Sequence, residues 1–333
     1  MSDHRDVLIL GAIEAERLSG TTWELLGCGR KLADKAEARL HCIIAGPGAG
    51  ILSLSAIAGG ADVVYASDDP HFQHYHPESY LPLVTEVAKQ ANPSIILLGH
   101  DDMGRDLAPR MAFKLAAGLC TDCIDISLDD QTGRLIHTRS VYGGNLMSAS
   151  VANTGTQIAT IRQKAMAPAK LDPDRVGSVI SVDVGIDPCA FAIKVTDRTE
   201  EADVGGVKLE DAKVVIGGGR GIGGPDGFKQ LEQMARKLNG AVGASRPPCD
   251  SGWMPAARQI GLTGQIVAPD VYIAVALSGS SQHLAGCSGS KKIVAVNSDP
   301  EANIFSVADF GAVGDWKEIL TSFMAKIDEL NQG

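Results

Sequence analysis

The sequence lacks any long apolar run. Its apolar stretches are short, as in the four residues VLIL at 7–10, and none approaches the roughly 18 residues needed to span a bilayer. The same stretch is too short for the apolar core of a secretory signal. We therefore expect no membrane insertion and a cytoplasmic location.

An excess of basic residues is also missing. The 333 residues include 30 Lys and Arg against 40 Asp and Glu, which gives a formal net charge of −10 at pH 7. Nucleic acids and anionic membrane surfaces attract positive charge, so neither is expected as the main partner. The seven cysteines are odd in number and mostly far apart, which indicates reduced thiols rather than a disulfide framework.

Glycine, by contrast, is abundant at 38 residues. Strand-like stretches such as DVLILGA, HCIIAG and SIILLGH alternate with helical ones such as RKLADKAEA and LPLVTEVAKQ. This alternation, with glycines at the corners, is typical of α/β proteins whose parallel sheet is covered by helices. We predict two doubly wound parallel-sheet domains, the second Rossmann-like. The charged segment DRTEEAD predicts their boundary near residue 205, giving domains 1–205 and 206–333.

A glycine-rich corner follows the strand-like KVVIGG of the second domain. Gly219-x-Gly221-x-x-Gly224 matches the dinucleotide-binding fingerprint. The acidic residue that the fingerprint requires about 20 positions further on is missing. From the pattern alone, a purely structural turn explains the three glycines equally well. Arg220 favours the ligand, because a guanidinium among glycines is suited to gripping a diphosphate.

More polar corners follow the other predicted strands of this domain. In parallel sheets the carboxyl ends of the strands share one edge, and ligands bind in the crevice outside it. Six such corners predict a long groove for a long ligand. They contain Arg220, then Ser245 with Arg246, Thr263, the run Ser278–Gly279–Ser280–Ser281–Gln282–His283, Asn297 and Asp315.

Two other motifs resemble functional sites, but we interpret both as structural. Cys120-Thr-Asp-Cys123 has the spacing of a redox or metal half-motif, but no second pair accompanies it, so we expect buried packing residues. His71, His74 and His76 lie close together without a carboxylate or cysteine at ligand spacing, so we expect a solvated loop. We predict no metal site and assign no catalytic residue.

The second domain resembles the alpha subunit of electron transfer flavoproteins. The resemblance rests on VYIAVALSGSSQHLAG followed by KKIVAVNSDPEANIF, with VVIGGGRGIGG, GASRPPCDSGWMP, RQIGLTGQIVAP and ADFGAVGDW in the same order. These stretches fall within residues 211–316. The first domain resembles the family more loosely, chiefly through GRDLAPR.

The resemblance implies one FAD in an extended groove of domain 206–333. Arg220 would hold the phosphates, Arg246 would place positive charge over the flavin, and Thr263 would lie near its N5 atom. His283 would lie near the pyrimidine carbonyl, where it and Arg246 place positive potential. The implied FAD-binding positions are Arg220, Ser245, Arg246, Gly261, Leu262, Thr263, Gly264, Ser278, Gly279, Ser280, Ser281, Gln282, His283, Asn297 and Asp315.

Two positions depart from the family pattern. Leu262 stands where the family commonly has glutamine, which removes a polar contact near the flavin, and Ala276 replaces a common glycine. Both departures bear on the tuning of the flavin potential.

The resemblance implies an electron carrier rather than a stand-alone enzyme. Its partner would be a beta subunit, contacted by the nucleotide-hydrolase-like domain 1–205 and holding AMP or a second FAD. Electrons would come from an acyl-CoA-type dehydrogenase of fatty acid oxidation and pass to a quinone reductase or another acceptor. An electron-bifurcating flavoprotein, which oxidises NADH and reduces ferredoxin, is the alternative. An ordinary nicotinamide dehydrogenase is disfavoured by the missing ribose-binding acid.

Overall fold

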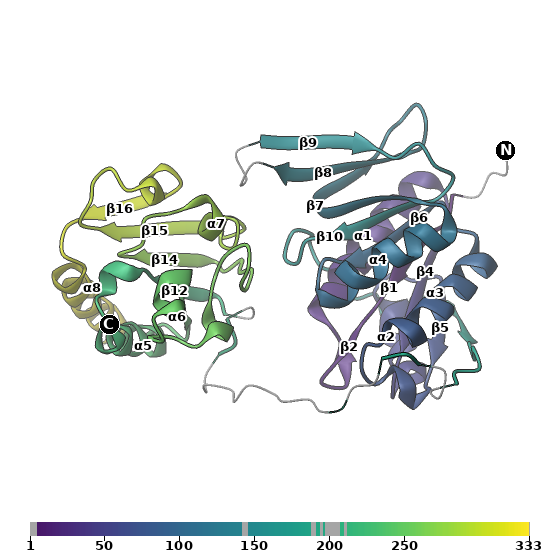
Figure 1. Ribbon diagram of the computed structural model, residues 1–333, viewed down its shortest axis with the longest axis horizontal. Helices are drawn as coiled ribbons and strands as arrows, with labels where there is room; N and C mark the ends of the chain where they lie inside the picture. The colour runs from purple at the N-terminus through teal and green to yellow at the C-terminus, as the bar shows by residue number, and fades with distance from the viewer. Residues whose placement is uncertain are drawn as a thin grey trace. The chain divides into compact units, whose positions relative to one another are not determined.

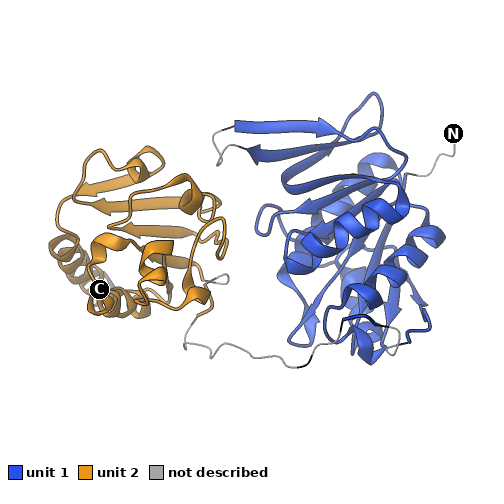
Figure 2. Cartoon of the chain, viewed as in Figure 1, with its two compact units in different colours: residues 1–196 blue, residues 197–333 orange. Residues whose placement is uncertain are grey.

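The computed structural model describes residues 5–141, 146–187, 191–193, 196, 207–209 and 212–332. The chain divides into two compact units, residues 1–196 and 197–333 (Figure 2). The boundary that we predicted between residues 205 and 206 lies outside the described residues.

Unit 1 contains a mixed sheet of nine strands with the order β11-β5-β4-β1-β6-β10-β7-β8-β9 (Figure 1). The strands from β11 to β7 in this order pair in parallel, and β7, β8 and β9 pair antiparallel. A hairpin of β2 (Ile13–Glu14) and β3 (Arg17–Leu18) stands apart from the sheet. The strands of the sheet are β1 (Val7–Leu10), β4 (Leu40–Ala45), β5 (Val63–Ser67), β6 (Ile95–Gly99), β7 (Gly118–Leu128), β8 (Leu135–Val141), β9 (Leu146–Val151), β10 (Gln157–Ile161) and β11 (Ser178–Ser181).

Helices cover both faces of the parallel part of this sheet. Helices α1 (Gly20–Ala36) and α2 (Ala49–Ala58) pack on the face that Val7 and Ile9 of β1 point to. Helices α3 (Pro77–Ala91) and α4 (Asp102–Leu115) pack on the opposite face with Leu8 and Leu10. A strand buried on both faces reads as a continuous apolar run, which is why the sequence predicted these strands.

The predicted α/β class is confirmed, and the parallel sheet of unit 1 continues into an antiparallel part made of β7, β8 and β9. Strand β7 extends over 11 residues, and the chain then turns back into β8 through residues 129–134, where the Gly133 N–H donates to the Asp129 carbonyl at 2.8 Å. An antiparallel partner needs only such a tight turn, without a crossover helix. The sequence of β8, LIHTRSV, mixes polar and apolar residues and gave no strong strand signal.

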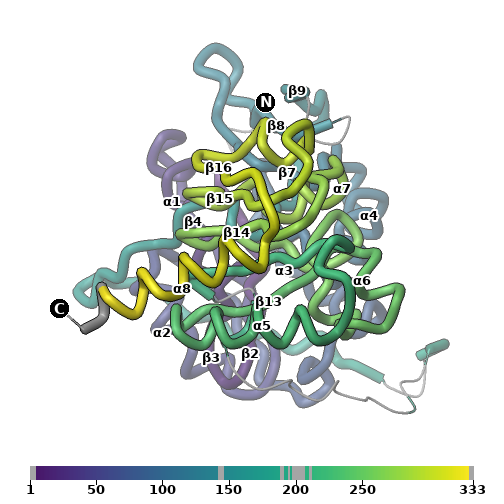
Figure 3. The backbone as a smooth tube through the Cα atoms, turned by 90° about the vertical axis from the view of Figure 1, so that its left-hand side faces the viewer, coloured from purple at the N-terminus to yellow at the C-terminus, as the bar shows by residue number. Residues whose placement is uncertain are grey.

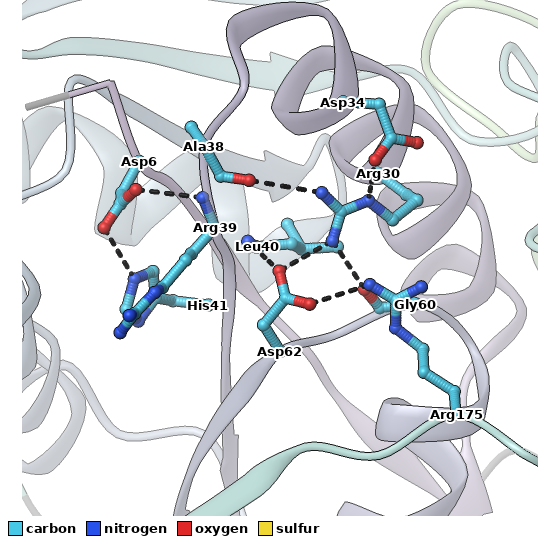
Figure 4. A network of polar contacts seen from close by, with 10 residues as sticks. All are labelled: Asp6, Arg30, Asp34, Ala38, Arg39, Leu40, His41, Gly60, Asp62 and Arg175. Carbon is cyan, nitrogen blue, oxygen red and sulfur yellow. Dashed lines mark hydrogen bonds and ion pairs between the residues drawn. The ribbon is translucent and has the colours of Figure 1, made fainter.

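A polar network joins α1 to the ends of two strands in unit 1 (Figure 4). The Asp62 carboxylate accepts hydrogen bonds from the Leu40 N–H at 2.8 Å and from Arg30 and Arg175 at 2.7 Å each. Partial burial opposes ionisation of Asp62, but these hydrogen bonds outweigh it and hold its pKa below the ordinary value. The network therefore fastens the segment around Arg175 to the sheet.

Unit 2 contains a parallel sheet of five strands with the order β13-β12-β14-β15-β16. Helices α5 (Pro225–Lys237) and α8 (Trp316–Gln332) cover one face and lie side by side, joined by the ion pair between Lys237 and Asp328 (Figures 1 and 3). Irregular segments around Ile260, Val267 and Ile304 cover the other face. The strands are β12 (Val214–Gly218), β13 (Ala241–Ala244), β14 (Val271–Val275), β15 (Lys292–Asn297) and β16 (Phe310–Val313), and two short helices are α6 (Arg246–Asp250) and α7 (Ser281–Leu284).

Candidate functional site

The candidate site of unit 2 lies at the switch point of its sheet. Strands β13 and β14 flank the first strand, β12, on opposite sides, so the connections leaving β12 and β14 diverge and open a crevice at their carboxyl ends. A cavity of about 400 Å³ lies there. Its lining comes from the ends of four strands: Arg220, Gly221, Ser245, Pro247, Ala276, Leu277, Ser278, Gly279, Ser280, His283, Asn297, Asp299 and Ala302.

The glycine-rich corner after β12 brings two strand ends into close contact. A Cβ atom at Gly219 would lie 2.1 Å from the carbonyl oxygen of Ala276, so only glycine fits there. Gly223 and Gly224 have φ values of 87° and 153°, and a Cβ at either would meet no atom within 4 Å. The corner thus leaves accessible backbone beside Arg220, as close approach of a ligand requires.

Two asparagine side chains donate hydrogen bonds to the backbone at the start of the loop Ser278–His283, which follows β14. Asn297 donates from its side-chain amide to the Leu277 carbonyl at 2.8 Å, and Asn303 donates to the Gly279 carbonyl at 2.6 Å. Gly279 has a φ of 77°, which turns the chain into α7. The N–H groups of Ser281 and Gln282 open that helix and so have no intrahelical partner. Such N–H groups can bind an anion.

His283 at the end of this loop is buried, with 4% of its surface exposed. Its Nδ1 lies 3.0 Å from the Ile260 carbonyl, which can only accept, so Nδ1 carries the proton. Its Nε2 lies 2.8 Å from the Tyr272 hydroxyl, which therefore donates to it. Burial lowers the pKa of His283 to about 4. With this pKa the buried imidazole of His283 is neutral at pH 7.

The predicted loop Gly261–Gly264 lies against the Ser278–His283 loop. The Leu262 N–H donates to the Gln282 carbonyl at 2.8 Å, and the Thr263 hydroxyl accepts from the Gln259 amide at 3.0 Å. The Leu262 side chain is 59% exposed. These four residues do not line the 400 Å³ cavity but border the loop that does.

Arg246 and Asp315 are not among the residues that line the cavity. Arg246 begins α6 on the protein surface and pairs with Asp250 at 3.2 Å. Asp315 lies before α8 and accepts from the Lys317 N–H at 2.8 Å. Its neighbour Gly314 donates to the Asn297 carbonyl at 3.0 Å, which ties this corner to the end of β15.

The structure also brings residues to the site that the sequence analysis missed. Asp299 lines the cavity two positions after Asn297, and the rule that polar residues follow strand ends could have found it. Tyr272 lies in the middle of β14, fully buried, where its apolar neighbours gave no signal.

Ala276, which stands where the family commonly has glycine, has an unusual backbone conformation in the structure. Ala276 has a φ of 51°, in the left-handed region, where glycine is favoured because it has no Cβ. Its methyl group lines the cavity opposite Gly221, where an added Cβ would lie 3.0 Å from it. The alanine thus combines local backbone strain with a slightly smaller cavity.

These features fit the diphosphate of an extended dinucleotide such as FAD. Arg220 offers a permanent positive charge, α7 offers unpaired N–H groups, and the glycine corner offers open backbone. The volume of about 400 Å³ lies within the range of small-molecule sites. The donor set therefore suits an anionic ligand.

Two features bear on other kinds of site. None of the helices among the described residues is long and apolar enough to cross a bilayer. Within those same residues, no three His, Cys, Asp or Glu side chains come together as a metal site.

Comparison with known proteins agrees with this geometry. Residues 8–187 match the family described as the electron transfer flavoprotein domain, and residues 208–288 match the electron transfer flavoprotein FAD-binding domain. The chain is 40% identical to the electron transfer flavoprotein subunit alpha of Thermoanaerobacterium thermosaccharolyticum, covering 99% of this chain and 100% of that protein. It is 37% identical to the subunit of that name from Bacillus subtilis, covering 98% of each, and 38% identical to protein FixB of Rhizobium meliloti, covering 94% and 90%. These matches confirm the resemblance drawn from the sequence.

Proposed function

Because the chain belongs to the electron transfer flavoprotein family as an alpha subunit, we propose that unit 2 binds one FAD and that the chain carries electrons as half of a heterodimer with a beta subunit. One observation carries the proposal. Polar residues from the ends of four parallel strands converge on a single cavity at the switch point of the sheet.

Different residues of the cavity contribute different interactions to FAD binding. Arg220 pairs with the diphosphate, and the N–H groups that open α7 hold its oxygens. Bound FAD supplies the electron-carrying chemistry, and the protein supplies position and electrostatics. His283 orients its loop as a neutral group, with both ring nitrogens engaged. Arg246 would then be the cationic residue near the flavin ring.

The finer assignments rest on the family resemblance. The donor is an acyl-CoA-type dehydrogenase, and the acceptor is a quinone reductase or another carrier. The beta subunit binds AMP or a second FAD and contacts the first domain. The heterodimer works in the cytoplasm.

The test is a flavin count on the heterodimer purified with its beta subunit, followed by addition of NADH. One FAD per heterodimer that NADH does not bleach supports a simple carrier. Two FAD that NADH bleaches rapidly would replace it by the bifurcating alternative. A complex without flavin, even after incubation with FAD, would refute the proposed function.

A further inference from the structure

The pair Cys120 and Cys123 lies at a bulge near the start of β7, far along the chain from the FAD-binding cavity. Cys120 pairs with Ala159 of β10, and Cys123 pairs with Ile161, so three steps on β7 span two on β10. The extra residue is accommodated by Asp122, which has a φ of 59°. Such a bulge changes the spacing and direction of the side chains on its strand.

The bulge brings the two cysteines to one face at a short distance. Ala159 and Ile161 lie two residues apart, or about 6.6 Å at the usual rise of a strand, and the cysteines paired with them have a similar separation. Disulfides form between Cα atoms that are about 4.4 to 6.8 Å apart. Cys123 belongs to the same buried core as Ala159 and Ile161, and Cys120 packs against that core. Without the bulge, an i, i+3 pair in a strand would point to opposite faces.

The thiol of one cysteine also contacts the backbone of the other. The Cys123 thiol donates a hydrogen bond to the Cys120 carbonyl oxygen at 3.7 Å. Cys120 is partly exposed, whereas Cys123 is fully buried. The pair therefore has one accessible sulfur and one sheltered sulfur beside it.

Positive charge faces the accessible sulfur. Arg139 on β8 pairs with Cys123 across the two strands, and its buried Nε lacks a hydrogen-bond partner among the described residues. Its positive charge favours the thiolate form of Cys120. The neighbouring carboxylate of Asp122 accepts two hydrogen bonds from the Arg162 guanidinium, at 2.8 and 2.7 Å. His100 lies near that ion pair, 4.0 Å from Asp122.

The surroundings of the two thiols change their pKa values in opposite directions. The hydrogen bond from Cys123, with those from Ser150 and Arg139, lowers the pKa of Cys120 to about 6. The pKa of Cys123 is raised, because its proton is shared with the Cys120 sulfur and because it is buried. Cys249, which is also partly exposed, has its pKa raised to about 11 by burial and therefore serves as the matched comparison.

We propose that Cys120 and Cys123 form a redox-active dithiol, which a low-molecular-weight disulfide oxidises to an intramolecular disulfide. The Cys120 thiolate attacks one sulfur of the reagent, forms a mixed disulfide and releases one thiolate. Cys123 then loses its proton and attacks the Cys120 sulfur, which releases the second thiolate. Two protein thiols are thereby oxidised, and one reagent disulfide is reduced to two thiols.

The test uses the full-length reduced chain, purified with its beta subunit, and oxidised glutathione. We expect a mass lower by two hydrogens and a peptide that links Cys120 to Cys123. In Cys123→Ala the reaction should stop with glutathione on Cys120, and in Cys120→Ala this site should not react. Cys249→Ala should behave as the unchanged chain.

The rate gives a second measure that needs no variant. We expect Cys120 to react with oxidised glutathione faster than Cys249 at pH 7, because the pKa of Cys120 is lowered whereas that of Cys249 is raised. Glutathione that remains on Cys120 of the unchanged chain, or two thiols that stay free in excess oxidised glutathione, would overturn the proposal. Neither outcome depends on bound FAD, so the proposed function is tested separately.

Discussion

The neutral, buried state of His283 predicts how the stability of unit 2 depends on pH. The folded pKa of about 4 lies below the ordinary value of 6.5, so the unfolded chain binds the proton more readily. The contribution of His283 is therefore unfavourable below pH 6.5 and grows as the pH falls to about 4. A pKa of about 4 in the folded chain against 6.5 in the unfolded chain corresponds to roughly 3 kcal/mol over that range.

The perturbation is His283→Gln, which keeps hydrogen-bonding capacity but cannot titrate. Urea unfolding, followed by the fluorescence of Trp253 and Trp316 in unit 2, would be compared at pH 7 and pH 4.5. We expect the unchanged chain to lose roughly 2 to 3 kcal/mol more than the variant between these conditions. Comparing the two chains cancels the other titrating groups. Equal losses would refute the assignment of a neutral, buried imidazole.

Three further predictions concern stability. Ala276→Gly should stabilise unit 2 by about 0.5 to 1 kcal/mol in thermal unfolding, because the relieved left-handed strain exceeds the added entropy of the unfolded chain, and a lower Tm would contradict it. Tyr272→Phe should cost about 1 to 3 kcal/mol in urea unfolding, because it leaves the buried Nε2 of His283 without a donor, and an unchanged midpoint would argue against that hydrogen bond. Asp62→Asn should lower the stability of unit 1 by about 2 kcal/mol at pH 7, and the difference should vanish as the pH falls through the depressed pKa of Asp62; a difference that persists at pH 2 would speak against the ion pairs.

Much of the candidate site follows from the sequence because parallel strands align their carboxyl ends. Arg220, Ser245, Ser278 and Asn297 are far apart in the chain, yet each follows an apolar strand, and all line one cavity. The strands themselves were readable because burial on both faces requires continuous apolar sequence.

Other features depend on three-dimensional contacts that local sequence does not encode. The neutral form of His283 results from the Ile260 carbonyl and the Tyr272 hydroxyl, which come from two other segments. The short separation of Cys120 and Cys123 results from a bulge where β7 pairs with β10. The antiparallel strands β8 and β9 were not predicted, because polar residues interrupt the apolar pattern of β9, which forms the edge of the sheet, and of β8 beside it.

The most direct test of the proposed FAD-binding cavity is a titration of the deflavinated heterodimer with FAD, followed by the quenching of flavin fluorescence. Arg220→Ala should weaken binding by about 10- to 100-fold, corresponding to the loss of one charge-assisted contact with the diphosphate. Arg258→Ala, which changes an arginine outside the cavity lining, should bind FAD as the unchanged chain does. Equal affinities for all three proteins would contradict the placement of the diphosphate beside the glycine corner.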